Sequence, residues 1–304
     1  MYREFFKLRE HPFSLTPDTD FWFDAAGHRD AMNVLLAMLR LGEGFIKVSA
    51  EIGLGKTLLC RQLLKELDSE FITAYVPDPQ LSPYGLICAV ADEIGGGTEE
   101  QYAKDRVMTF IRTRLLSLAE RGKRVVLVID EAHQLPEITF ETLRLLTNLE
   151  TEKFKLLQVV IVGQPELNTR LSQPSMRQLN QRISFSCSLS PMSLQATAGY
   201  IFHRIRVADC RSKLRFTDDA IRQICKSSGG IPRVINVLCH KSLMVAYGRG
   251  DFRITGEHVE RAVEDTDLAS RSGSWRNPFA TMRGLLFPPP RASFDLGALH
   301  GIDR

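Results

Sequence analysis

The stretch that decides the fold runs from residue 44 to residue 57 and reads Gly44-Phe-Ile-Lys-Val-Ser-Ala-Glu-Ile-Gly-Leu-Gly-Lys-Thr57. It begins with a short apolar run of the kind that forms a buried strand, and from Lys56 onward apolar residues recur at helical spacing. Gly53 and Gly55 allow the loop between them to turn its backbone N–H groups inward. A strand, a glycine-containing loop and a helix in this order predict a phosphate-binding loop.

The expected nucleotide contacts are consecutive residues, namely Ala50, Glu51, Ile52, Gly53, Leu54, Gly55, Lys56 and Thr57. Backbone N–H groups would hold phosphate oxygens, Lys56 would reach the β- and γ-phosphates of ATP, and Thr57 would bind Mg²⁺. Ala50 replaces the first glycine of the usual pattern, and alanine fits there if its φ is negative. The alternative is an ordinary strand–turn–helix unit with an exposed lysine, which the flanking strand and helix disfavour.

A second apolar run, Arg124-Val-Val-Leu-Val-Ile129, ends in two adjacent acids, Asp130 and Glu131. At the end of a buried strand Asp130 can hold Mg²⁺ opposite Thr57, and Glu131 can act as the general base that activates water. Two acids after a strand could also simply begin a solvated loop, and the upstream glycine loop argues against that interpretation. His133 reads as a structural or relay residue, because no partner stands at the spacing of a metal ligand.

Other polar residues give weaker signals. Gln164 follows the apolar run at 157–162 and could sense the γ-phosphate from the end of a strand, or be a turn residue before a proline. Arg177, Arg182 and Arg233 have the chemistry to stabilise phosphate charge, but by themselves they read as solvated surface charges.

The order of elements predicts an α/β fold. Strands are expected at 44–49, 71–76, 124–129, 156–162 and 183–189, with helices at 28–41, 56–67, 83–94, 102–121 and 137–149. Strands separated by helices imply a parallel sheet covered on both faces. After about residue 192 the strand signals stop, and helices are expected at 193–209, 217–228, 232–248 and 255–268.

These elements suggest three parts of the chain. Residues 1–192 form an α/β nucleotide-binding domain, on which the irregular segment 1–30 is expected to pack. Residues 193–268 form a small helical lid domain, and residues 269–304 form a disordered basic tail rich in arginine, glycine and proline.

Charge and composition exclude several classes of protein. The 304 residues are 44% hydrophobic and carry a net charge of +3, and the five arginines and two aspartates of residues 271–304 account for all of it. The remainder is neutral, which disfavours nucleic acid as a partner. The six cysteines lack metal-like spacing, and no signal peptide or membrane span is evident. A cytoplasmic location is expected.

Together these motifs resemble those of the AAA+ ATPases, and within them the ExeA/MshM type of secretion and type IV pilus biogenesis ATPase, with the MshM type most similar. The resemblance covers residues 1–268. It rests on Phe5-Phe-Lys-Leu-Arg-Glu-His-Pro-Phe13, Leu15-Thr-Pro-Asp18, Gly42-Glu-Gly-Phe-Ile46, Gly53-Leu-Gly-Lys-Thr57, Ile129-Asp-Glu-Ala-His133, Gly163-Gln-Pro-Glu-Leu167, Leu179-Asn-Gln-Arg-Ile183 and Gly229-Gly-Ile-Pro-Arg-Val-Ile-Asn236.

The resemblance implies a parallel-sheet P-loop NTPase core of the AAA+ kind with a helical lid. It implies Lys56 and Thr57 as the Walker A pair, and Asp130 and Glu131 as Walker B. Gln164 would be sensor 1. Arg182 would be the arginine finger acting on a neighbouring subunit, with Arg177 as second choice. Arg233 would be sensor 2.

The resemblance further implies a homo-oligomer that hydrolyses ATP with Mg²⁺ and works with pilus or secretion assembly proteins at the inner membrane. The membrane span and periplasmic part of ExeA-type proteins are not found in this sequence, so any membrane role is expected to pass through a partner. Two other functions remain open: a DNA-associated regulator like the transposition ATPases, and a nucleotide-binding scaffold with little turnover. Neutral charge over residues 1–270 argues against the first, and Glu131 against the second.

Overall fold

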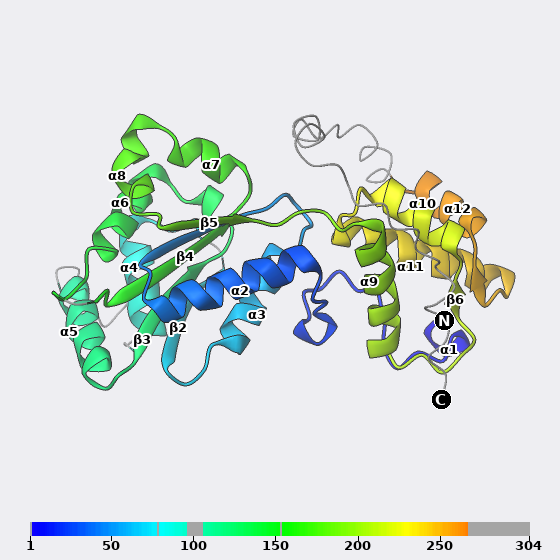
Figure 1. Ribbon diagram of the computed structural model, residues 1–304, viewed down its shortest axis with the longest axis horizontal. Helices are drawn as coiled ribbons and strands as arrows, with labels where there is room; N and C mark the ends of the chain where they lie inside the picture. The colour runs from blue at the N-terminus through cyan, green and yellow to red at the C-terminus, as the bar shows by residue number, and fades with distance from the viewer. Residues whose placement is uncertain (1, 78, 96–105, 153, 267–304) are drawn as a thin grey trace, which may run out of the picture.

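A computed structural model describes residues 2–77, 79–95, 106–152 and 154–266 of the chain (Figure 1). The tail expected at 269–304 and the first turn of the helix expected at 102–121 lie outside these ranges. Within them, none of the helices combines the length and hydropathy that crossing a bilayer requires.

The core of the fold is a parallel sheet of five strands in the order β2-β3-β4-β1-β5. Their bounds are β1 (Phe45–Ser49), β2 (Phe71–Val76), β3 (Arg124–Ile129), β4 (Leu157–Gly163) and β5 (Phe185–Ser188). Each predicted strand is present, which confirms the α/β fold class. In β3, Val126 and Val128 face one side of the sheet while Leu127 and Ile129 face the other, and all four are buried. Burial on both faces explains why these strands are continuous apolar runs.

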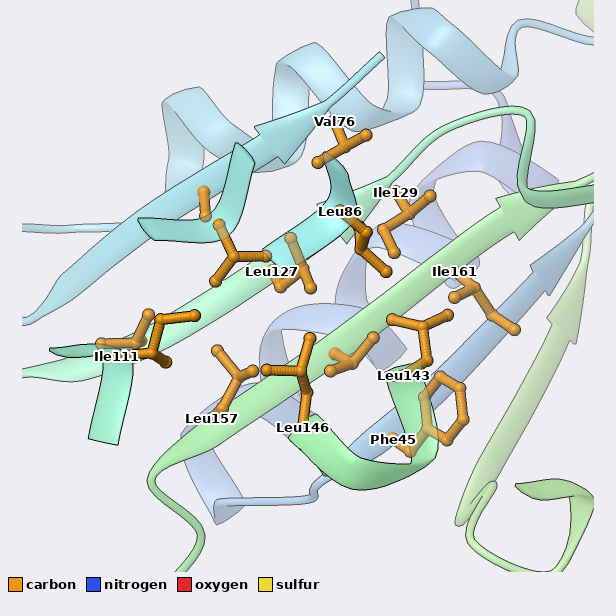
Figure 2. Close-up of a cluster of buried hydrophobic side chains, with 14 of the residues drawn as sticks. Phe45, Val76, Leu86, Ile111, Leu127, Ile129, Leu143, Leu146, Leu157 and Ile161 are labelled. Atoms are coloured by element: carbon orange, nitrogen blue, oxygen red, sulfur yellow. The ribbon is translucent and has the colours of Figure 1, made fainter. Parts of the chain in front are cut away.

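Helices cover both faces of this sheet. On one face lie α2 (Ala26–Leu41) and α3 (Lys56–Glu66). On the other lie α4 (Pro83–Glu93), α5 (Val107–Glu120) and α6 (Glu137–Leu146), joined by the shorter α7 (Glu166–Leu171) and α8 (Arg177–Asn180). Figure 2 shows this second face, where Leu127 and Ile161 of the strands meet Leu86 of α4 and Leu143 of α6. The predicted helices therefore bury their apolar sides against the sheet.

Beyond the sheet the chain forms a separate cluster of helices, at the right of Figure 1. They are α9 (Leu194–Val207), α10 (Asp218–Ser228), α11 (Pro232–Arg249) and α12 (Gly256–Glu264). The expectation that strands stop near residue 192 is wrong in one detail, because β6 (Arg215–Phe216) and β7 (Arg253–Ile254) form a parallel pair. Two-residue strands are too short to produce a period in the sequence. They hold the first turns of α10 and α12 side by side.

The N-terminal segment differs from the expectation that it packs on the α/β domain. It contains α1 (Tyr2–Phe5) and the 3₁₀ turn η1 (Thr19–Phe21), and most of its buried side chains belong to the helical cluster. Phe5 stacks on Phe252 with ring centroids 4.5 Å apart. Only the part near Trp22 also reaches the sheet side, where Arg61 of α3 donates a hydrogen bond to the Pro17 carbonyl. The segment thus connects the two parts of the molecule, with most of its buried apolar side chains packed in the helical cluster.

Candidate functional site

The loop from Ala50 to Gly55 joins the carboxyl end of β1 to the first residue of α3. Gly53 and Gly55 have φ values of 82° and 91°, which is the left-handed region that glycine adopts at little cost. Ala50, where the usual pattern has glycine, is not among the residues with positive φ, so alanine fits this position. The loop therefore has the conformation that its sequence predicts, with a helix N-terminus directly after it.

The side chain of Lys56 lies within this loop. It is 5% exposed, and its Nζ donates hydrogen bonds to the carbonyl oxygens of Ala50 at 3.0 Å and Glu51 at 3.2 Å. Burial lowers the pKa of Lys56. Among the described residues no carboxylate lies within ion-pair distance of Nζ. A buried ammonium group held only by neutral carbonyls can accept an anion such as a phosphate group as its counter-charge.

Thr57 and Asp130 form the second part of the site. Oγ1 of Thr57 donates a hydrogen bond of 2.6 Å to Oδ2 of Asp130, and Oδ1 of Asp130 accepts one from the Glu131 N–H at 2.8 Å. Asp130 is 2% exposed, and burial raises its carboxyl pKa although the hydrogen bond from Thr57 acts in the opposite direction. A hydroxyl and a carboxylate oxygen side by side are hard ligands of the kind that Mg²⁺ prefers.

Glu131 lies beside two other polar side chains. Its backbone is in the left-handed region with a φ of 48°, and its Oε2 is 3.4 Å from Nε2 of Gln164 and 3.5 Å from Nδ1 of His133. The backbone N–H of Gln164 also points at Nδ1 of His133, at 3.4 Å. Glu131 is therefore held by a small polar network and, unlike Asp130, is not buried.

The strand order explains how these residues meet. Because β4 lies between β1 and β3, the carboxyl ends of all three strands share one edge of the sheet. Ser49, at the end of β1, pairs with Gly163 at the end of β4. The residues that follow the strands are therefore brought together: Ala50 after β1, Gln164 after β4 and Asp130 after β3. Ligands of open α/β sheets bind at this edge, where the chain order of the strands reverses.

The three arginines are placed differently from one another. Arg182 is half-buried, and its guanidinium donates to the Thr147 carbonyl at 3.4 Å, near the C-terminal end of α6. Arg177 is exposed on α8, and neither forms a contact with the loop at 50–57 within the described chain. Arg233, at the start of α11, does contact the loop, because its backbone N–H donates to the Gly53 carbonyl at 3.2 Å. Its side chain is exposed.

One residue at the site has no signal in the sequence pattern. His28, near the start of α2, points its Nε2 at the Leu54 carbonyl, 2.7 Å away. The two residues are 26 positions apart, and a lone histidine on a helix normally reads as a core or surface residue. The contact between His28 and the Leu54 carbonyl becomes visible only in the structure, where α2 packs against the loop.

Comparison with known proteins places this site in a family. The family described as "AAA domain" matches residues 39–171, which include the loop and Asp130. General secretion pathway protein A of Aeromonas hydrophila is 38% identical over 277 residues, which are 91% of this chain and 50% of that protein. The chain thus spans about half the length of this curated relative.

Solved structures show the same fold at low sequence identity. Cdc6p from Pyrobaculum aerophilum has a TM-score of 0.64 at 18% identity, covering 84% of this chain and 70% of that one. The ORC2 protein of Aeropyrum pernix has a TM-score of 0.61 at 14% identity, covering 84% and 71%. The RuvB motor of Thermotoga maritima has a TM-score of 0.53 at 19% identity, covering 78% and 68%.

The fold, the phosphate-loop geometry and the curated relative agree with one another. A parallel sheet of this strand order carries the glycine-containing loop at 50–55 after β1, and a helical cluster follows the sheet in the chain. Residues 39–171 thus match the AAA domain family, and 91% of the chain is similar, at 38% identity, to general secretion pathway protein A.

Proposed function

We propose that this protein binds ATP with Mg²⁺ in the loop at residues 50–57 and hydrolyses the terminal phosphate. The observation that carries the proposal is Lys56, a buried cation whose hydrogen-bond partners are neutral carbonyls. Burying an ammonium group without a counter-charge is costly, and phosphate oxygens of a nucleotide would supply that charge. Backbone N–H groups of the same loop would share in holding the phosphates.

The polar residues around the loop divide the chemistry. Thr57 and Asp130 present the oxygens that would hold Mg²⁺, which when bound neutralises charge on phosphate oxygens. Glu131, held near Gln164 and His133, would accept a proton from the attacking water. Gln164 follows β4, which lies between β1 and β3 in the sheet. From that position it would respond to the terminal phosphate.

Assembly forms the second part of the proposal. Arg182 has no partner in the site of its own chain, and it is tied to the end of α6, where Leu145 is 47% exposed. An exposed leucine two residues before the carbonyl that Arg182 contacts suits an interface with a second copy, in which Arg182 would stabilise charge on the terminal phosphate. We also propose that residues 1–192 act as the nucleotide-binding domain and 193–268 as its lid, with Arg233 as sensor 2, which would move the lid with the nucleotide state.

The similarity to general secretion pathway protein A supports a role in building a secretion or type IV pilus apparatus. In that role the protein would work from the cytoplasm, with assembly proteins at the inner membrane as partners. If turnover of the purified protein were instead stimulated by duplex DNA, the DNA-associated alternative would be favoured.

Substitution of Lys56 tests the nucleotide site. Lys56→Ala removes the counter-charge, and we expect ATP binding and hydrolysis to be lost. Lys65→Ala is the matched control, because Lys65 lies on the same helix but is exposed and paired with Asp20. Binding of a fluorescent ATP analogue and phosphate release report the two effects. Unchanged turnover in Lys56→Ala would remove the loop as the site.

A further inference from the structure

The carbonyl groups of the phosphate-binding loop need hydrogen-bond donors of their own. A loop that turns its N–H groups inward toward a phosphate turns its carbonyl groups outward, and buried carbonyls are costly without a donor. The described contacts account for five of them. The carbonyls of Ala50 and Glu51 accept from Lys56, and that of Gly53 accepts from the Arg233 N–H. That of Leu54 accepts from His28, and that of Gly55 accepts from the Leu59 N–H.

The donor to Leu54 is the one that comes from a side chain outside the loop. His28 is 5% exposed, and its Nε2 lies 2.7 Å from the Leu54 oxygen. Because a carbonyl oxygen only accepts, Nε2 must carry the hydrogen. Burial also lowers the pKa of His28, so the neutral ring with a protonated Nε2 is the form present near neutral pH.

The histidine ring packs against its neighbours. The Trp22 ring packs edge-on against it, with centroids 5.8 Å apart and planes at 81°. Gly55 also lies close to the ring, since a Cβ atom there would be in ordinary van der Waals contact with Nε2, at 3.4 Å. A ring fixed by packing loses little further freedom when it makes the hydrogen bond.

We propose that His28 is a positioning residue for the nucleotide site: its Nε2–H holds the Leu54 carbonyl outward, and thereby keeps the N–H groups of the loop directed at the phosphates. This inference rests on the proposed function, because it concerns how the same loop binds ATP. It adds a residue of α2 to a site otherwise built from the ends of three strands.

Three substitutions separate the hydrogen bond from ring packing. His28→Phe keeps a ring against Trp22 but has no donor. His28→Gln has an amide N–H at about the reach of Nε2, whereas His28→Asn is shorter by one bond and cannot place its amide there. His28→Phe and His28→Asn should bind ATP and ADP roughly tenfold more weakly, the order expected for a lost hydrogen bond in a buried site, and His28→Gln should recover most of the affinity.

A positioning role predicts a particular split between kinetic constants. His28 touches no reacting atom, so KM should rise in His28→Phe while kcat at saturating ATP stays close to that of the wild type. In the nucleotide-free protein, amide hydrogen exchange of the peptide spanning residues 50–57 should be faster in His28→Phe than in the wild type. That measurement needs no activity. His240→Ala is the control, because His240 also makes a single side-chain hydrogen bond, to Tyr2, within the helical cluster.

The outcomes are distinguishable. Wild-type affinity in His28→Phe, or a His28→Gln variant no better than His28→Phe, would overturn the role of the hydrogen bond. If either ring-less variant merely melts earlier, with unchanged loop exchange and affinity, His28 is a packing residue only. If the wild type binds no nucleotide and Lys56→Ala changes nothing, the proposed function falls and this inference falls with it.

Discussion

Asp130 and Glu131 are neighbours in the chain but lie in different surroundings. Asp130 is buried and accepts hydrogen bonds from Thr57 and from a backbone N–H, so both of its oxygens are already oriented. Glu131 is only partly buried and faces Gln164. A fixed, buried carboxylate suits a metal ligand, and a more accessible one suits proton transfer to and from water.

This difference predicts the behaviour of Glu131→Gln. Glutamine keeps the shape and the hydrogen-bonding reach but cannot accept a proton, so affinity for ATP should stay within about twofold while hydrolysis falls on the order of 10²-fold or more. Equilibrium binding and single-turnover hydrolysis measure the two quantities. Glu137→Gln is the control, because Glu137 is exposed at the start of α6. Collapse of binding together with turnover would show that Glu131 also holds the metal or the nucleotide.

At the scale of elements, the loop at 50–57 is in direct contact with the start of α11. The Arg233 N–H donates to the Gly53 carbonyl, and a Cβ atom at Gly53 would lie 2.9 Å from Cβ of Arg233 and 3.0 Å from Cγ2 of Ile231. Gly53 is thus required by its positive φ and also by the approach of a helix from the other part of the molecule. Movement of α11 would be transmitted to the loop through this contact.

Gly53→Ala tests the contact, and Gly42→Ala is the matched control. Both glycines have φ values above 80°, but a Cβ atom at Gly42 would have no neighbour within 4 Å. Each variant should lose about 1–2 kcal/mol of stability from the left-handed backbone. Gly53→Ala should lose about 1–3 kcal/mol more from the clash, and nucleotide affinity with it. Chemical denaturation and nucleotide binding measure both effects; equal losses in the two variants would contradict a role for the α11 contact.

At the scale of the whole molecule, Arg182 is the residue whose proposed role needs a second copy. Within its own chain it reaches Thr147 and not the loop. If it stabilises the terminal phosphate of a neighbour, turnover per chain should rise with protein concentration as copies associate. A monomer with concentration-independent turnover would rule out this arrangement.

Mixing two inactive variants also tests whether Arg182 acts on a neighbouring copy. Arg182→Ala should bind ATP nearly as well as the wild type and hydrolyse it about 10³-fold more slowly, the order seen when an arginine finger is lost. Mixed with Lys56→Ala, it should recover part of the activity, because one variant supplies a working loop and the other a working arginine. Arg177→Ala tests the second-choice arginine, which is exposed on α8, and this variant should keep its own turnover if Arg182 is the finger. Co-assembled mixtures that stay inactive would place Arg182 outside the trans mechanism.

Local patterns in the sequence determined much of this protein. Each strand of the sheet was predicted, as was a helix beginning at Lys56, because apolar periods and glycine positions depend on neighbouring residues. The pairing of Thr57 with Asp130 also followed from two motifs, since Thr57 stands at the start of the helix after the β1 loop and Asp130 directly follows β3. The strands β6 and β7 were not predicted, because two residues are too few to show the alternation of apolar and polar residues that marks a strand.

Contacts between distant residues were decided only by the tertiary structure. The N-terminal aromatic side chains pack in the helical cluster, where Phe5 stacks on Phe252. Three features of the site depend on how distant elements pack. They are the strand order that sets Gln164 between the loop and Asp130, the contact of Arg233 with Gly53, and the hydrogen bond from His28 to Leu54. Hydrophobic periodicity and motif spacing in one sequence do not predict such contacts. Each residue fits the pattern of its own helix or strand whether or not its distant partner is near.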